Sequence, residues 1–115
     1  MSQFTHDVTL ANFESVVDTH EIVLLDFWAE WCGPCKIFGP VFEDAAQRHP
    51  DIYFGKVNTE IATDLSEAFQ VRSIPTVMAF KKSELVFEQA GVLAPAILDE
   101  LIQKLRELEL PSQSG

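Results

Sequence analysis

Two cysteines separated by two residues stand at a predicted junction between a strand and a helix. They form the segment Cys32-Gly33-Pro34-Cys35, which closely follows the apolar run of residues 22–28. An apolar run of this length is typical of a strand buried on both faces. Because these are the chain's only two cysteines, each must pair with the other, bind another group or stay unused. Their position favours dithiol–disulfide chemistry.

Length and charge restrict the class of protein. A chain of 115 residues suits one domain, which we expect to span residues 1–115 with a C-terminal tail from about residue 109. Eighteen acidic residues against eight basic ones give a net charge of −10. That balance argues against nucleic-acid binding, because such binding depends on Lys and Arg neutralising phosphates. Two cysteines are too few for a disulfide-stapled mini-protein or an all-cysteine zinc site.

The distribution of apolar residues bears on location. Residues 1–7 lack a basic start followed by an apolar run, so we expect no signal peptide. No apolar stretch is long enough to span a bilayer, so we expect no membrane contact. A cytoplasmic location is therefore the expectation, and a monomer is the default because no obvious extra apolar face remains. In a reducing compartment a Cys-x-x-Cys pair is more often catalytic or metal-binding than static.

Strand-like and helix-like segments alternate along the chain, which predicts an α/β domain with a largely parallel sheet. We expect strands at residues 4–8, 22–29, 52–58, 76–80 and 85–89, the last two forming a hairpin. We expect helices that begin after Thr9, near Cys32, after Thr59 and at Pro95.

The spacing of apolar residues predicts the inward faces of the later helices. The third helix should bury Ile61, Leu65, Ala68 and Phe69. The last helix should bury Ile97, Leu98, Leu101, Leu105 and Leu108. The hairpin connection at residues 81–84 contains no glycine to supply a positive φ, so its turn type stays open.

The segment around the cysteines resembles the thioredoxin family, and the similarity extends over nearly the whole chain. Trp-Cys-Gly-Pro-Cys is specific to that family, whereas a bare Cys-x-x-Cys is not. The resemblance rests on residues 26–36, Pro40, Lys56-Val57-Asn58, Ser73-Ile74-Pro75-Thr76 and Gly91. It implies the thioredoxin fold, with a central mixed five-stranded sheet in the order 1-3-2-4-5 flanked by four helices.

Cys32 is the expected nucleophile. At a helix N-terminus the free backbone N–H groups and the helix dipole favour the thiolate, which is the form that attacks a disulfide sulfur. Cys35, one helical turn further on, is placed to attack the resulting mixed disulfide. Gly33 permits a close approach, and Pro34 fixes φ within the first turn. The alternative is a static disulfide or an unused thiol pair.

Asp26 lies inside the apolar strand, where burial should raise its pKa. A carboxyl of this kind near the thiols can accept or donate the Cys35 proton, and the resemblance implies that role. An aspartate at a strand end that reaches solvent is the alternative. In the family, a lysine at the position of Lys56 lies near the buried aspartate. A solvated lysine fits the sequence nearly as well.

Ile74-Pro75 precedes an expected strand, where a proline suits a turn or an edge. The sequence alone favours a trans proline, but the resemblance implies a cis peptide beside the cysteines, with backbone groups free to pair with an extended substrate. The resemblance also implies an apolar rim that binds disulfide-bearing proteins. That rim comprises Trp31, Gly33, Pro34, Ile74, Pro75, Gly91 and Val92.

The resemblance implies a protein-disulfide reductase without a bound cofactor or metal. Its electrons would come from NADPH through a flavoprotein, thioredoxin reductase. An oxidase or isomerase on the same fold is the nearest alternative, and Gly33-Pro34 and Ile74 favour the reductase. Two other classes stay open: a metal-binding module that takes further ligands from a second chain, and a structural subunit that uses only the apolar rim.

Overall fold

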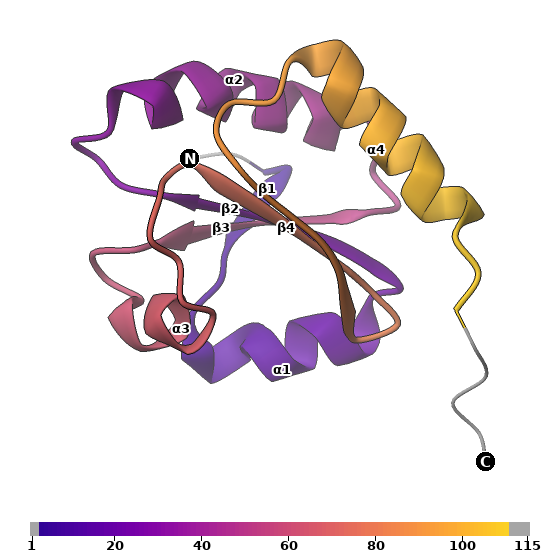
Figure 1. Cartoon of the computed structure of the whole chain (residues 1–115). Helices are drawn as coiled ribbons and strands as arrows, with labels where there is room; N and C mark the ends of the chain where they lie inside the picture. The colour runs from indigo at the N-terminus through magenta and orange to yellow at the C-terminus, as the bar shows by residue number, and fades with distance from the viewer. Residues whose placement is uncertain (1–2, 111–115) are drawn as a thin grey trace.

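A central sheet lies between two layers of helices in the computed structural model, which describes residues 3–110 (Figure 1). Its elements are β1 (Thr5–Asp7), α1 (Leu10–Thr19), β2 (Ile22–Trp28), α2 (Gly33–Arg48), β3 (Tyr53–Asn58), α3 (Thr63–Ala68), β4 (Thr76–Lys81), β5 (Glu84–Ala90) and α4 (Pro95–Glu107). The strand order β1-β3-β2-β4-β5 confirms the implied fold. Residues 111–115 of the expected tail lie outside the described residues. Within residues 3–110, no helix is long and apolar enough to cross a membrane.

Strand β2 occupies the middle of the sheet, parallel to β3 on one side and antiparallel to β4 on the other. Residues 22–27 are all buried, as the apolar run predicted. Val23, Leu25 and Phe27 join the core beneath α1 and α3, whereas Leu24 joins the core beneath α2 and α4. Because side chains alternate along a strand, Asp26 faces the same layer as Leu24. The strand therefore presents Asp26 to the layer whose helix α2 begins beside the cysteines.

The segment before α3 departs from the expected helix. The hydroxyl of Thr59 donates to the carbonyl oxygen of Trp28 at 3.1 Å, so Thr59 ties the loop to β2 and does not cap a helix. The helix begins only at Thr63. The expected inward positions of Ile61 and Ala68 are wrong, since Ile61 is 76% exposed and Ala68 is also exposed.

Helix α4 begins at Pro95 as expected, but its buried stripe is narrower. Leu98, Ile102 and Leu105 are buried. The expected burial of Ile97 and Leu108 is wrong, since they are 51% and 37% exposed. These two side chains line a groove between α4 and β5, the edge strand of the sheet, and no further strand covers that side of α4 in the described part of the chain.

The β4–β5 turn has positive φ at two residues that are not glycine. Lys82 has a φ of 52° and Ser83 a φ of 70°, as a two-residue type I′ turn requires. The Lys82 N–H donates to the Glu21 carbonyl at 2.8 Å. The Ser83 hydroxyl lies 3.0 Å from the Val17 carbonyl oxygen and 2.9 Å from an Asp18 carboxylate oxygen. The local sequence did not decide the type of this turn. Hydrogen bonds to α1 and to the loop after it stabilise the type I′ turn that forms.

Lys81 is a buried cation, only 4% exposed. Its ammonium donates to the carbonyl oxygens of Leu105, Arg106 and Leu108 at the C-terminal end of α4. The last carbonyls of a helix have no partner within the helix, and the helix dipole favours a cation there. Lys81 therefore joins β4 to the carbonyl groups at the end of α4.

We expect Lys81→Met to lower the free energy of unfolding by about 2 kcal/mol, because it removes the charged donor that three carbonyl oxygens at the end of α4 share. The control is Lys82→Met, which makes the same chemical change at an exposed neighbour and should cost less than about 0.5 kcal/mol. Urea denaturation of both variants measures the difference. Equal losses in the two variants would show that the Lys81 contacts contribute nothing specific.

Candidate functional site

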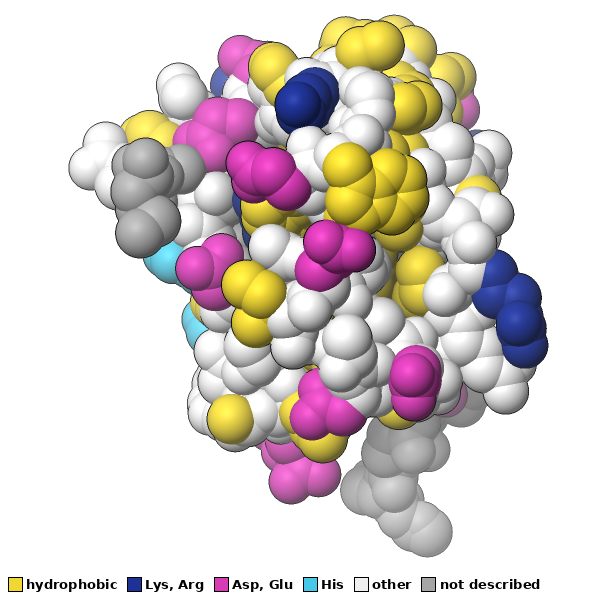
Figure 2. Space-filling model, turned by 90° about the vertical axis from the view of Figure 1, so that its left-hand side faces the viewer, with side chains coloured by type: hydrophobic (Ala, Val, Ile, Leu, Met, Phe, Trp, Pro, Cys, Tyr) yellow, Lys and Arg dark blue, Asp and Glu magenta, His cyan; other side chains and the backbone are white. Residues whose placement is uncertain are grey.

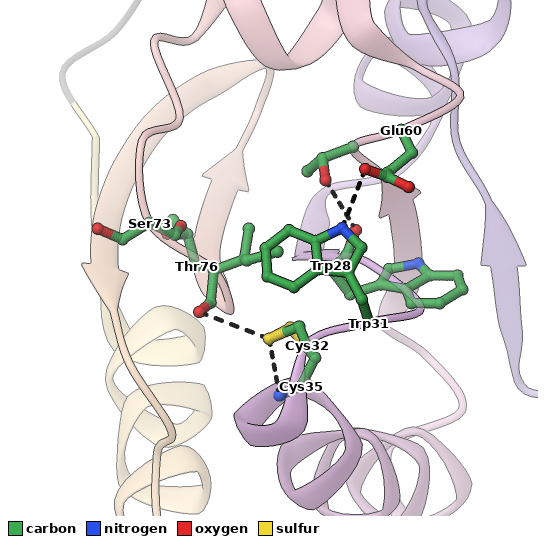
Figure 3. Close-up of a disulfide and its surroundings, with 9 residues drawn as sticks. Trp28, Trp31, Cys32, Cys35, Glu60, Ser73 and Thr76 are labelled. Carbon is green, nitrogen blue, oxygen red and sulfur yellow. Dashed lines mark hydrogen bonds between the residues drawn. A yellow bond between two sulfur atoms is a disulfide. The ribbon is translucent and has the colours of Figure 1, made fainter.

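Cys32 and Cys35 form a disulfide where β2 leads into α2, as Figure 3 shows. Their Cα atoms lie 5.2 Å apart. Cys32 is the N-cap of the helix, and its Sγ accepts the backbone N–H of Cys35 at 3.1 Å. In the dithiol form, that N–H and the positive end of the helix dipole would stabilise a thiolate on Cys32. The pair lies at the strand-to-helix junction that the sequence predicted.

Ile74-Pro75 is a cis peptide, which confirms what the resemblance implied. The carbonyl oxygen of Ile74 lies 3.7 Å from Sγ of Cys32. The N–H of Gly91 donates to the carbonyl of Pro75 at 2.8 Å. The φ of Gly91 is +101°, in a region that favours glycine. Three segments that are distant in the sequence therefore meet beside the disulfide.

The residues of the expected rim belong to the segments that meet at this pair. On the face of the molecule that Figure 2 shows, hydrophobic side chains gather over part of the surface and acidic side chains lie beside them. Trp31 is 67% exposed and Val92 is 42% exposed, Ile74 is half-buried and Pro75 is buried. The remaining rim residues, Gly33, Pro34 and Gly91, are exposed. The surface is thus mostly open, and only Pro75 lies beneath it.

Trp31 has a charged partner that no local pattern in the sequence indicates. Its indole N–H donates to a carboxylate oxygen of Glu60 at 2.9 Å (Figure 3). Glu60 belongs to the loop between β3 and α3, and its own N–H donates to the side-chain oxygen of Asn58 at 2.9 Å. The two partners are 29 residues apart in sequence, so only the folded chain brings them together.

Asp26 is 1% exposed, and neither carboxylate oxygen has a hydrogen-bond partner in the described part of the chain. Removal from water raises its pKa from the ordinary 3.8 to about 7. The positive charge of Lys56, which stands opposite Asp26 in the β2–β3 pairing, opposes part of that rise. The predicted burial and the predicted direction of the pKa change are both confirmed.

Lys56 is half-buried, and its Nζ lies 4.8 Å above the centre of the Trp28 ring. Beside them is a cavity of about 150 Å³ whose lining includes Trp28, Cys35 and Lys56. A space of this size with polar and charged walls is able to hold water. The cavity therefore connects the surroundings of the second cysteine with the lysine that faces Asp26.

The pKa of Asp26 predicts how stability depends on pH. The unfolded carboxyl ionises near its ordinary pKa of 3.8, whereas the folded one ionises near 7. Between these values the folded protein binds more protons than the unfolded chain, so this group lowers the free energy of unfolding as pH rises. Asp26→Asn should therefore be more stable than the wild type above pH 7, by at most about 4 kcal/mol.

Denaturant unfolding of the oxidised protein from pH 4 to pH 8 measures this effect. The gain of Asp26→Asn over the wild type should be small at pH 4 and should grow until about pH 7. Asp64→Asn, at an exposed carboxylate, is the control and should show no such growth. A gain that is constant across the pH range would mean that Asp26 ionises normally in the folded protein.

Three comparisons with known proteins agree with this geometry. A family model described as Thioredoxin matches residues 4–107. A Streptomyces coelicolor protein described as a thioredoxin is 49% identical over 106 residues, which cover 92% of this chain and 79% of that protein. A thioredoxin of Mycoplasmoides gallisepticum is 38% identical over 98 residues, covering 85% and 98%. The solved structure of a mutant thioredoxin from Halobacterium salinarum NRC-1 superposes with a TM-score of 0.85, is 32% identical, and covers 96% and 98%.

Proposed function

Since this chain belongs to the thioredoxin family, we propose that it reduces protein disulfides, with Cys32 as the attacking thiolate and Cys35 as the resolving thiol. The observation that carries the proposal is the Cys32–Cys35 disulfide at the N-terminus of α2, with the Ile74 carbonyl beside Cys32. The chain is a thiol–disulfide oxidoreductase of the thioredoxin type. The proposal adds the direction of the reaction, which is reduction of the substrate, and the role of each residue.

The proposed reaction has two exchange steps. The Cys32 thiolate attacks one sulfur of a substrate disulfide, forms a mixed disulfide, and releases the other substrate sulfur as a thiolate. Cys35 then loses its proton and attacks Sγ of Cys32, which releases the second substrate sulfur. Two electrons have then passed to the substrate, whose two sulfurs take up the proton that Cys35 lost and one proton from water, and the protein holds the Cys32–Cys35 disulfide. The 5.2 Å separation of the two Cα atoms suits that closing step.

We assign the removal of the Cys35 proton to Asp26. Its pKa of about 7 lets the carboxylate accept a proton near neutral pH and release it again. It faces the α2 layer, and a cavity lined by Cys35 and by Lys56, the residue paired with Asp26 on β3, offers room for water. Lys56 is the tuning residue, because its charge keeps the pKa of Asp26 from rising further.

Substrate proteins would bind on the rim around the disulfide. Exposed apolar surface next to a reactive group fits an apolar, extended segment of a substrate chain. The Ile74 carbonyl, close to Cys32, is a backbone acceptor placed at the reacting sulfur. We assign this binding role to the rim residues Trp31, Gly33, Pro34, Ile74, Pro75, Gly91 and Val92.

The oxidised form must be reduced again for a second cycle. We propose that an NADPH-dependent flavoprotein, thioredoxin reductase, supplies the electrons, and that the chain itself binds no cofactor. A donor of this kind works where thiols are kept reduced, so we place it in the cytoplasm, acting as a monomer.

Substitution of each cysteine should block the reaction at a different step. Cys32→Ser should lower the rate of reduction of a disulfide-linked peptide by about a thousandfold or more, because it removes the attacking thiolate. Cys35→Ser should still attack but should accumulate the mixed disulfide, detectable as a covalent adduct by mass spectrometry. Cellular function that survives the loss of both cysteines would favour the structural-subunit alternative.

Asp26 should control the resolving step. Asp26→Asn should slow the decay of the mixed disulfide by about tenfold or more at pH 7, measured by rapid acid quench. In the wild type that decay should titrate near pH 7. Lys56→Gln should move this titration to higher pH, because it removes the charge that lowers the pKa of Asp26.

Lys104→Gln, at an exposed lysine of α4, is the matched control for Lys56→Gln. It should leave the pH at which the resolving step titrates unchanged. If Lys56→Gln behaves like Lys104→Gln, Lys56 does not tune Asp26.

A further inference from the structure

The Glu60 carboxylate lies beside the apolar rim. It accepts a hydrogen bond from Trp31, the largest side chain of that rim. We propose that Glu60 is a specificity-determining residue, which favours substrate segments that carry Arg or Lys next to the disulfide. The proposal rests on the proposed function, because it concerns which disulfides the same site reduces. Its chemistry is charge complementarity beside a reacting bond.

Glu60 is held in place and is not a freely moving surface charge. One of its carboxylate oxygens accepts the indole N–H of Trp31 at 2.9 Å. Its backbone N–H is fixed by Asn58 at 2.9 Å, and the neighbouring Thr59 donates both its N–H and its hydroxyl to the Trp28 carbonyl. The loop is therefore tied to the end of β2. A substrate that lies on the indole meets a negative charge at a defined position.

The remaining capacity of this carboxylate suits a cation. A carboxylate offers about four lone-pair sites, and the single indole N–H fills one of them. Trp31 precedes Cys32 directly, so a side chain that reaches Glu60 belongs to the part of a substrate near the attacked sulfur. Arg or Lys there would bring its positive charge to Glu60 while the face of the indole attracts the same cation.

The Trp31 indole supplies an apolar surface next to this charge. It is 67% exposed and hydrogen-bonded to the Glu60 carboxylate. The methylene stem of Arg or Lys packs well on apolar surface while its charged end stays at a carboxylate. The Trp31 indole and the Glu60 carboxylate therefore match both parts of a long basic side chain.

The preference should be confined to this side of the site. Lys36 is exposed in the first turn of α2, directly after the second cysteine, so the surroundings of the thiols are not uniformly negative. Glu30 is exposed and precedes Trp31 in the chain, but it lines the same cavity as Lys36 and Lys56, so its charge has basic neighbours there. Acidic side chains gathered beside the hydrophobic surface are visible in Figure 2.

The test uses three disulfide-linked peptides that are identical except for one residue next to the cysteine, which is Arg, Gln or Glu. We expect the wild type to show a kcat/KM about fivefold higher for the Arg peptide than for the Glu peptide at low salt, in the range of an exposed ion pair. The ratio should shrink as salt screens the charges. Glu60→Gln keeps an acceptor for the indole but removes the charge, so it should reduce the ratio to below about twofold and leave the Gln peptide unchanged.

Glu14→Gln is the matched control, because it makes the same charge change at an exposed residue of α1. It should keep the wild-type ratio. The proposal is overturned if Glu60→Gln slows all three peptides by the same factor, which would mean that Glu60 only positions Trp31. It is also overturned if Glu14→Gln lowers the ratio equally, since the overall charge would then be responsible. A wild type that reduces none of the peptides would instead refute the proposed function itself.

Discussion

The burial of β2 on both of its faces is the constraint on which the fold and the chemistry depend. The strand is paired along both edges, and helices cover both faces of the sheet. This fixes the point at which the chain leaves the sheet, and Cys32 stands there as the N-cap of α2. The same burial keeps water from Asp26 and raises its pKa. Strand β2 thus determines both the position of the two cysteines and the pKa of Asp26, the proposed proton acceptor for Cys35.

Two buried charged residues on neighbouring strands show how burial separates a structural role from a chemical one. Lys81 is satisfied by three carbonyl oxygens at the end of α4, and its charge matches the helix dipole. Asp26 has no hydrogen-bond partner for either oxygen among residues 3–110, so its ionised form destabilises the fold. An apolar residue would suit a core chosen for stability alone, and the unsatisfied carboxyl therefore marks a site where chemistry outweighs stability.

The parts of the molecule that local sequence predicted are those governed by near neighbours. The apolar run of β2, the cysteines at its end and the burial of Asp26 follow from adjacent residues, and every expected strand end lies within one residue of the observed one. The strand order and the cis Ile74-Pro75 bond came from family resemblance. The outward position of Ile61, the partner of Trp31 and the positive φ values at Lys82 and Ser83 depend on contacts between distant segments. No periodicity in the sequence records such contacts.

The same division separates the reaction from the choice of substrate. The disulfide and Asp26 belong to β2 and the N-terminus of α2, where Cys32, Cys35 and Asp26 are all buried. The Glu60 carboxylate, by contrast, stands on a loop, is exposed, and contacts the site through the indole of Trp31. A change there alters the charge that a substrate meets without moving the sulfurs. Chemistry fixed by a buried strand and selectivity carried by an adjoining loop can therefore vary independently in this fold.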